Sequence, residues 1–222
     1  MEEGYNSVII LFDLDGTLID STEAILESFH NSFDVHAHPH PSDEEIKRLI
    51  GHPLDVMYSR LGISEEMVWQ FVTTYKEHYR IISTQKTVLL ESAKEAVLVA
   101  NEIATLGIVT TKTGAYSQIL MEYFGLMQYF EVLVGREHVQ KPKPDAEPIE
   151  RALALLDKND SDIWMIGDTQ MDLISAANAG VNSIGVLSGY DTKETLERFT
   201  NVIFSDAFEA VKYLKNRNIS HT

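Results

Sequence analysis

The sequence of 222 residues contains no cysteine, which excludes disulfides, thiolate zinc sites and a thiol nucleophile. Positive charge is scarce, because 18 Lys and Arg face 34 Asp and Glu and give a formal net charge of −16. This balance argues against nucleic acid or an anionic membrane surface as the main partner. There is no apolar run of the roughly 18 residues that span a membrane, and the opening residues lack a signal-peptide pattern. We therefore expect a soluble, cytoplasmic protein.

One stretch near the N-terminus combines a buried strand with two acids. Five apolar residues, Val8 to Phe12, run directly into Asp13-Leu14-Asp15-Gly16-Thr17. A short apolar run before turn residues predicts a strand that is buried on both faces. Ligands of open α/β sheets bind at the carboxyl ends of the strands, where Asp13 and Asp15 could hold a hard cation through oxygen. An ordinary Asp-Gly turn after a strand is the alternative interpretation.

The rest of the chain changes its periodicity twice. Residues 21–83 carry apolar side chains at helical spacing, with no strand pattern among them. From Thr87 onward, short apolar runs alternate with helical segments, which is typical of right-handed βαβ crossovers and a parallel sheet. We predict an α/β fold with a doubly wound parallel sheet. Its core would comprise residues 1–17 and 86–222, and residues 18–85 would form a small all-α cap domain inserted after the first strand.

Three later stretches place polar groups at predicted strand ends. Thr110 and Thr111 precede a helix, where hydroxyl and backbone N–H groups suit a phosphate oxygen. Lys141 lies before Pro142, which favours an extended backbone. Asp168 ends another buried run, and Asp172 follows it by one helical turn. Each feature has an ordinary explanation as well: a helix cap, a solvated lysine, and acids that stabilise a helix N-terminus.

Taken together, Asp-x-Asp-Gly-Thr, a strand-terminal Thr, a Lys before Pro and Gly-Asp-x-x-x-Asp resemble the haloacid dehalogenase superfamily, which is mostly phosphatases. Residues 13–21, the helical cap and Lys-Pro-Lys-Pro are similar to its phosphoglycolate phosphatase branch. The resemblance implies Mg²⁺ as cofactor and a small phosphorylated metabolite as substrate, with 2-phosphoglycolate as the first candidate. We expect either a monomer or a homodimer, and the sequence does not distinguish the two.

The same resemblance implies a role for each matching residue. Asp13 would be the nucleophile that accepts the phosphoryl group, and Asp15 would be the general acid and then the base. Thr110 would hold a phosphate oxygen, and Lys141 would neutralise charge between nucleophile and phosphate. Asp168 would bind Mg²⁺ with Asp13 and the backbone carbonyl of Asp15, and Asp172 would complete the metal and lysine shell. The second acid, Asp15, favours phosphoryl transfer over dehalogenation.

Substrate-side residues are less constrained by the sequence. Thr111 stands where family phosphatases often have Asn, and Val88 to Ser92 replaces a common Pro-Gly pair. In the cap, His52 is our candidate for a residue that faces the substrate, ahead of Arg48 and Arg60. His36, His38 and His40 could bind a soft divalent metal, although no carboxylate or Cys is interleaved with them.

Several functions remain open at this stage. Within enzymes, the alternatives are a pyrophosphatase, a sugar-phosphate or nucleotide phosphatase, and a phosphoglucomutase-type transferase. A catalytically silent protein that binds a phosphorylated ligand is the alternative from another class. The presence of Asp13, Asp15, Lys141 and Asp168 together speaks against a silent relative.

Overall fold

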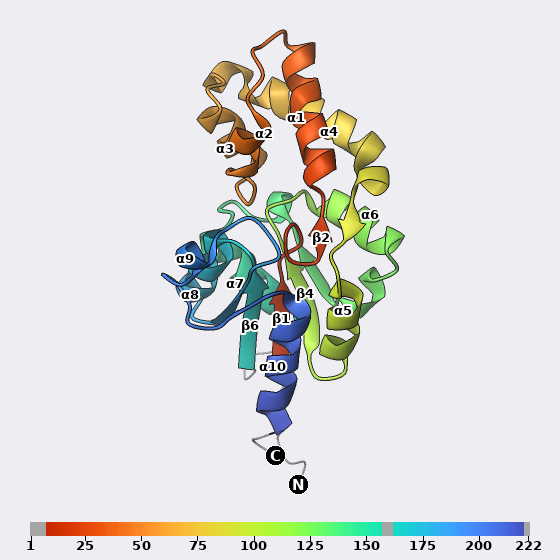
Figure 1. The fold of residues 1–222 in the computed structure, drawn as a ribbon, viewed down its shortest axis with the longest axis vertical. Helices are drawn as coiled ribbons and strands as arrows, with labels where there is room; N and C mark the ends of the chain where they lie inside the picture. Colours follow the sequence, from red (N-terminus) through yellow and green to blue (C-terminus); the bar gives the residue numbers. More distant parts are fainter. Residues whose placement is uncertain (1–7, 157–161, 220–222) are drawn as a thin grey trace.

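The computed structural model describes residues 8–156 and 162–219 as an α/β core with a group of helices at one end (Figure 1). The core is a six-stranded sheet in the order β5-β4-β1-β6-β7-β8, and every strand pair in it is parallel. Its strands are β1 (Val8–Phe12), β4 (Thr105–Val109), β5 (Val132–Val134), β6 (Asp162–Gly167), β7 (Asn182–Val186) and β8 (Ile203–Phe204). The predicted fold class is confirmed.

The central strand β1 is buried on both faces because it lies between β4 and β6 and under two layers of helices. Its residues alternate between two hydrophobic clusters: Ile10 and Phe12 belong to one, and Ile9 and Leu11 to the other. This alternation follows from the two-residue repeat of a strand. It explains why the sequence shows a continuous apolar run here instead of an amphipathic pattern.

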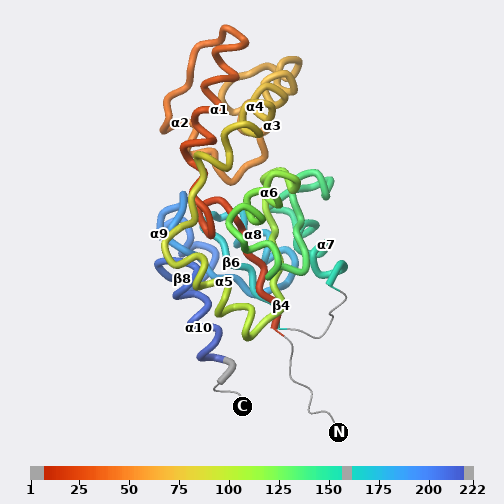
Figure 2. The backbone as a smooth tube through the Cα atoms, turned by 90° about the vertical axis from the view of Figure 1, so that its right-hand side faces the viewer, coloured from red at the N-terminus to blue at the C-terminus, as the bar shows by residue number. Residues whose placement is uncertain are grey.

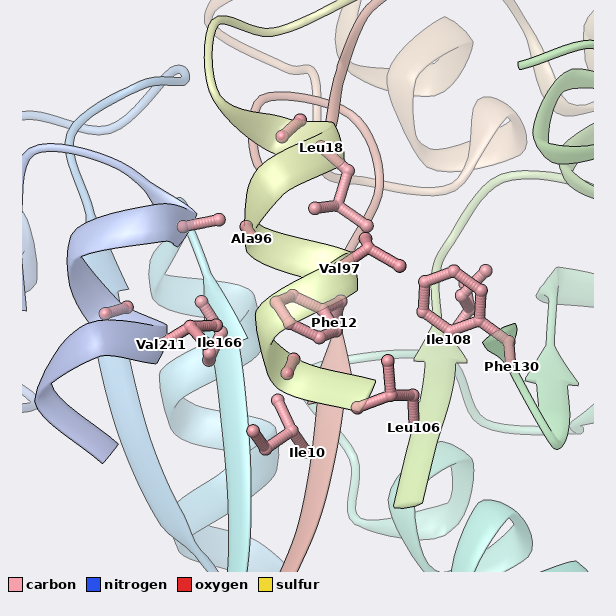
Figure 3. Close-up of a cluster of buried hydrophobic side chains, with 14 of the residues drawn as sticks. Ile10, Phe12, Leu18, Ala96, Val97, Leu106, Ile108, Phe130, Ile166 and Val211 are labelled. Carbon is pink, nitrogen blue, oxygen red and sulfur yellow. The ribbon is translucent and has the colours of Figure 1, made fainter. Parts of the chain in front are cut away.

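Helices cover each face of the sheet. On one face lie α5 (Ala93–Asn101), α6 (Gly114–Tyr123) and α10 (Ala207–Ile219). Figure 3 shows Val97 of α5 next to Phe12 and Val211 of α10 beside Ile166. On the other face lie α7 (Glu147–Leu156) and α8 (Gln170–Asn178). The core also contains the short helix α9 (Lys193–Leu196) and the 3₁₀ turns η1 (Met127–Tyr129) and η2 (Arg136–His138).

The helical group has a hydrophobic core of its own. It consists of α1 (Thr22–Val35), α2 (Asp43–Lys47), α3 (Leu54–Arg60) and α4 (Glu65–Lys86), which lie together beyond the sheet in Figure 2. Its buried centre is aromatic, with the rings of Phe29 and Tyr58 4.7 Å apart and those of Phe33 and Phe71 5.1 Å apart. No helix in the described part of the chain has the length and apolarity required to cross a bilayer.

Two very short strands join the helical group to the core. β2 (Ile19–Asp20) and β3 (Val88–Leu89) pair antiparallel, with Ile19 opposite Leu89. The chain therefore enters and leaves the helices through one paired connection, directly after the loop that carries Asp13 and Asp15. Two-residue strands have no detectable sequence period, so the sequence did not predict them.

Two serines that directly precede helices do not cap them. Ser92 precedes α5 in the left-handed region (φ 63°), so its side chain makes no capping hydrogen bond. Ser21 precedes α1 but also caps nothing, because its hydroxyl donates to Asp15 instead. Ser42, by contrast, caps α2, since its hydroxyl accepts from the backbone N–H of Glu45.

Candidate active site

The carboxyl ends of β1 and β6 bring the distant acidic residues together. Asp13 follows β1 directly and Asp168 follows β6, and these two strands are paired. Asp172 lies in the first turn of α8, just beyond Asp168. All three side chains are buried, and each offers a carboxylate oxygen within 4.8 Å of the other two.

A lysine enters this cluster from the loop before α7. The ammonium of Lys143 lies 2.9 Å from Asp13 Oδ1 and donates to Asp172 Oδ1 at 2.5 Å. It also donates to the backbone carbonyl of Val109 at the end of β4, at 3.1 Å. Burial lowers the pKa of Lys143, but the two carboxylates outweigh this and hold the pKa above its ordinary value. Lys143 therefore remains a fixed positive charge at the ends of three elements.

The expectation that Lys141 occupies this position is wrong. The side chain of Lys141 is 74% exposed, and its ammonium approaches only Asp145 Oδ2, at 4.0 Å. Its backbone N–H is held on the outside of the loop by Glu147. Lys141 and Lys143 each precede a proline, so the local pattern did not distinguish them. Asp145, two residues after Lys143, accepts from the backbone N–H of Glu147 at the start of α7, so Lys143 is the lysine nearer to the helix.

Asp168 and Asp172 are held by separate sets of donors. Asp168 accepts from the Thr17 hydroxyl at 3.0 Å and from the Tyr190 backbone N–H at 2.9 Å. Asp172 uses its second oxygen to accept from the backbone and hydroxyl of Thr169, at 3.0 and 2.8 Å. Both oxygens of Asp172 are thus occupied by Lys143 and Thr169, so this residue mainly orients Lys143.

Desolvation dominates the electrostatics of the acids. The pKa of Asp13 is raised from 3.8 to about 6. Burial raises it most, the Lys143 ammonium lowers it, and the charge of Asp172 raises it. Burial also raises the pKa of Asp168 well above its ordinary value, and the carboxylates of Asp172 and Asp13 add to the effect. The three buried carboxylates carry more negative charge than the single Lys143 ammonium can neutralise.

This donor set fits Mg²⁺. The cation takes oxygen ligands and keeps several waters, so two or three carboxylates are enough to hold it. Asp13 and Asp168 have the oxygens best placed for the task. Among the described residues, Asp13 Oδ1 is buried and has no hydrogen-bond partner apart from the ammonium beside it, and each oxygen of Asp168 accepts from one uncharged donor. Asp172, by contrast, binds the Lys143 ammonium and two donors of Thr169. The carboxylate of Asp15 is not part of this cluster, because it faces Lys112 and Ser21; a contribution from the Asp15 backbone carbonyl stays a prediction.

Asp15 forms a second centre with a lysine that the sequence analysis did not single out. Lys112, in the loop after β4, contacts both oxygens of the Asp15 carboxylate, at 2.8 and 3.1 Å. The Ser21 hydroxyl donates to the same carboxylate, and the ring of Tyr79 from α4 lies 4.7 Å from the ammonium. Asp15 thus lies where the core loop, the connection to the helices and α4 meet.

A cavity of about 240 Å³ opens between the helical group and the core next to this pair. Asp15, Thr111 and Lys112 line its core end, and His52 is among the residues on the helical side. The other lining residues are Ile25, Ile50, Gly51, Leu54, Asp55, Met57, Trp69, Val72, Tyr75, Lys76, Tyr79, Thr113, Tyr116, Arg136 and Glu137. Most of its wall is aromatic or aliphatic.

The remaining predicted site residues take different positions around the cavity. Thr110 is buried at the end of β4, where its hydroxyl accepts from the Lys112 backbone N–H at 3.2 Å. Thr111 donates to the Gly51 carbonyl at 3.0 Å and so joins the core to the helices. His52 lines the cavity and bonds to Arg60 at 2.8 Å, whereas Arg48 and Arg60 do not line it.

The three histidines of the run do not converge. His36 bonds to Thr74 at 2.9 Å, His38 packs edge-on against Phe71, and His40 bonds to Asp34 and to His30. Among the described residues, the cluster of Asp13, Asp168 and Asp172 is the group of three or more such side chains close enough to share a metal. The proposed soft-metal site in this run is therefore not formed.

Comparison with known proteins agrees with this geometry. A family model described as haloacid dehalogenase-like hydrolase matches residues 10–186, and the chain belongs to this family, as a hydrolase of its phosphatase group. Pyrophosphatase PpaX of Halalkalibacterium halodurans is 33% identical over 78% of this chain and 80% of its own length. The corresponding protein of Bacillus pumilus is 32% identical over 84% and 86%.

Solved structures share the whole fold. A haloacid dehalogenase-like hydrolase from Bacteroides fragilis superposes with a TM-score of 0.87 at 27% identity and covers 92% of this chain and 99% of its own. A predicted phosphoglycolate phosphatase from Haemophilus somnus 129pt gives a TM-score of 0.85 at 22% identity, over 95% and 99% of the two chains. The second likeness supports the fold alone.

Proposed function

We propose that this protein is a Mg²⁺-dependent phosphatase that transfers the phosphoryl group of a small substrate first to Asp13 and then to water. The observation that supports this most directly is the buried Asp13 carboxylate at a strand end, 2.9 Å from the Lys143 ammonium and beside Asp168. A pKa of about 6 leaves Asp13 largely ionised at neutral pH, as a nucleophile requires.

The reaction balances in two displacements. In the first, an oxygen of Asp13 forms a bond to phosphorus, the bond from phosphorus to the leaving oxygen breaks, and Asp15 delivers its proton to that oxygen. In the second, water attacks the phosphorus of the aspartyl-phosphate while Asp15 accepts a proton from it. The Asp13 carboxylate leaves, and inorganic phosphate is released. The Asp15 side chain is mostly buried but lines the cavity, and so can reach a group bound there.

Charge is the main obstacle, since an anionic nucleophile approaches a phosphate dianion. Lys143 is already fixed against Asp13, so its charge needs no rearrangement to counter that repulsion. Thr110, at the neighbouring strand end, would hold a phosphate oxygen through its hydroxyl. Mg²⁺, held by Asp13 and Asp168, would supply the further positive charge that stabilises the equatorial oxygens.

Residues 18–85 would act as a lid over the leaving group, with Thr111 and His52 on the substrate side. Contacts across the junction support this role: Thr111 with Gly51, and the Tyr116 hydroxyl with the Lys76 carbonyl at 3.2 Å. A lid of this kind excludes water and completes the site around the substrate.

Two compounds are the first candidate substrates. The sequence pattern favours 2-phosphoglycolate, and the relatives named pyrophosphatase PpaX favour pyrophosphate. We would screen phosphorylated metabolites with Mg²⁺ for released phosphate, including both compounds, sugar phosphates and nucleotides. Product analysis with a hexose phosphate would reveal a mutase, which returns the phosphoryl group to the substrate.

Two controls test the mechanism. Asp13→Asn should abolish turnover while the protein stays folded, because it removes the nucleophile's charge. Excess chelator should also remove activity. Near-normal activity in either case would overturn the proposal.

A further inference from the structure

Lys112 is a buried cation that the proposed chemistry does not use. Its side chain is 8% exposed, and that of its partner Asp15 is 13% exposed. Burial lowers the pKa of Lys112, but the Asp15 carboxylate and Tyr79 outweigh this and hold the pKa above its ordinary value. The ammonium therefore stays charged in a site largely closed to water.

The cavity beside Lys112 has room for a small group. Its volume of about 240 Å³ corresponds to about eight water molecules, at roughly 30 Å³ each. Its walls include Tyr79, whose ring lies 4.7 Å from the Lys112 ammonium, and Tyr75 and Val72 of the same helix. A charge acts more strongly beside such walls than in water, because little solvent screens it.

Three other titratable side chains at the cavity, those of Arg136, Glu137 and His52, have partners elsewhere. Arg136 donates to the Val139 carbonyl at 3.1 Å, and Glu137 accepts from the backbone N–H groups at the start of α6. His52 is bonded to Arg60, and burial together with Arg60 lowers its pKa. Lys112 therefore provides the buried ammonium next to the residue that must contact the leaving oxygen.

The geometry allows Lys112 to change partners. In the structure it holds both Asp15 oxygens, and its next contact, the Ser21 hydroxyl, is at 3.4 Å. When an Asp15 oxygen turns to the leaving oxygen, an N–H of the ammonium is released beside the leaving group. An anionic oxygen placed there would accept a charge-assisted hydrogen bond.

We propose that Lys112 determines specificity by binding an anionic oxygen of the leaving group, so that this site prefers phosphoryl substrates whose leaving group is negatively charged next to the leaving oxygen. This inference rests on the proposed function and narrows its substrate class. Both 2-phosphoglycolate, with its carboxylate, and pyrophosphate, with its second phosphate, meet the condition. Neutral sugar leaving groups do not.

A matched pair of esters tests the preference: 2-phosphoglycolate and 2-hydroxyethyl phosphate, which has a hydroxyl in place of the carboxylate. The charged ester should have the higher kcat/KM in the unaltered protein. Lys112→Met should reduce the ratio of the two kcat/KM values by about tenfold or more, as expected for loss of a charged hydrogen bond. Lys112→Arg should keep the preference. Lys141→Met, which removes an exposed lysine, should leave the ratio unchanged.

Binding provides a readout that is independent of turnover. Calorimetry with both esters and Mg²⁺ would be carried out on Asp13→Asn protein, with and without Lys112→Met. Tighter binding of the charged ester that is lost with Lys112→Met supports the inference, even if the unaltered protein hydrolyses no phosphoryl compound and the proposed function fails. Hydrolysis with an equal effect of Lys112→Met on both esters would overturn the inference and leave the proposed function intact.

Discussion

Lys143 and Asp13 form a buried ion pair, with 2.9 Å between the ammonium nitrogen and the nearer carboxylate oxygen. The same ammonium lies 2.5 Å from Asp172, so one cation joins acids from β1's end and from α8. Without this charge, two carboxylates would face each other where water cannot screen them. Such an arrangement is costly unless a cation is present.

Lys143→Met should therefore lower kcat/KM on any accepted phosphate ester by about a hundredfold to a thousandfold, the usual effect of removing a fixed stabilising charge. Lys141→Met should change it by no more than about twofold, because an exposed pair contributes little. Steady-state kinetics would measure both, with circular dichroism to verify folding. Equal losses in the two variants would contradict the assignment of Lys143 to the site.

The positions of the acids at strand ends could be predicted because buried strands are recognisable in the sequence. Continuous apolar runs ended at Asp13 and Asp168, and parallel strands put their carboxyl ends at one edge of the sheet. The order of strands and helices could be predicted from the changes in the spacing of apolar residues along the chain. The short pair β2–β3 was not visible, since two residues carry no period.

The contacts of the lysines could not be predicted from the sequence. Lys141 and Lys143 have the same local pattern, and the path of the loop decides which one is buried. The pairing of Lys112 with Asp15 spans 97 positions and depends on the placement of β4 beside β1. Ser21 has the residue type of a helix cap, but its hydroxyl faces Asp15 because the connection to α1 passes that carboxylate.

Removing the charge of Asp13 should stabilise the metal-free protein above about pH 6. Its pKa is raised from 3.8 to about 6 on folding, so the native state binds this proton more tightly than the unfolded state. The free energy of unfolding therefore falls as pH rises from about 3.8 to about 6, and the full loss is present above that interval. Asp13→Asn should thus gain up to about 3 kcal/mol near pH 8 and much less near pH 4.

Denaturant melts in chelator at several pH values would measure this gain. With Mg²⁺ present the gain should shrink or reverse, because the unaltered carboxylate then binds the cation. A gain that does not vary with pH would show that the charge of Asp13 carries no folding penalty.

Mg²⁺ should raise the Tm, and its apparent affinity should fall as pH drops through about 6. Burial raises the pKa of Asp13 to about 6 and that of Asp168 well above its ordinary value, so protons compete with the cation for both acids. Calorimetric titration between about pH 5 and pH 8 would measure the affinity. Asp168→Asn should lose the Mg²⁺ effect, whereas Asp34→Asn, on an exposed part of α1, should retain it. An affinity independent of pH would place the cation elsewhere.

Gly16→Ala should disrupt the site far more than Gly62→Ala. Both glycines have positive φ, 84° and 89°, so an alanine is strained to a similar degree at each. At Gly16 an added Cβ would lie 2.3 Å from Asp168 Oδ2, whereas at Gly62 it would meet nothing within 4 Å. The difference between the two variants therefore measures the close approach of the Asp15–Thr17 loop to Asp168.

We expect Gly16→Ala to be less stable than Gly62→Ala by about 1–3 kcal/mol. It should also lose most of the Mg²⁺-dependent rise in Tm, because Asp168 must move to admit the methyl group. Equal Tm values and equal Mg²⁺ responses in the two variants would show that this loop does not constrain Asp168.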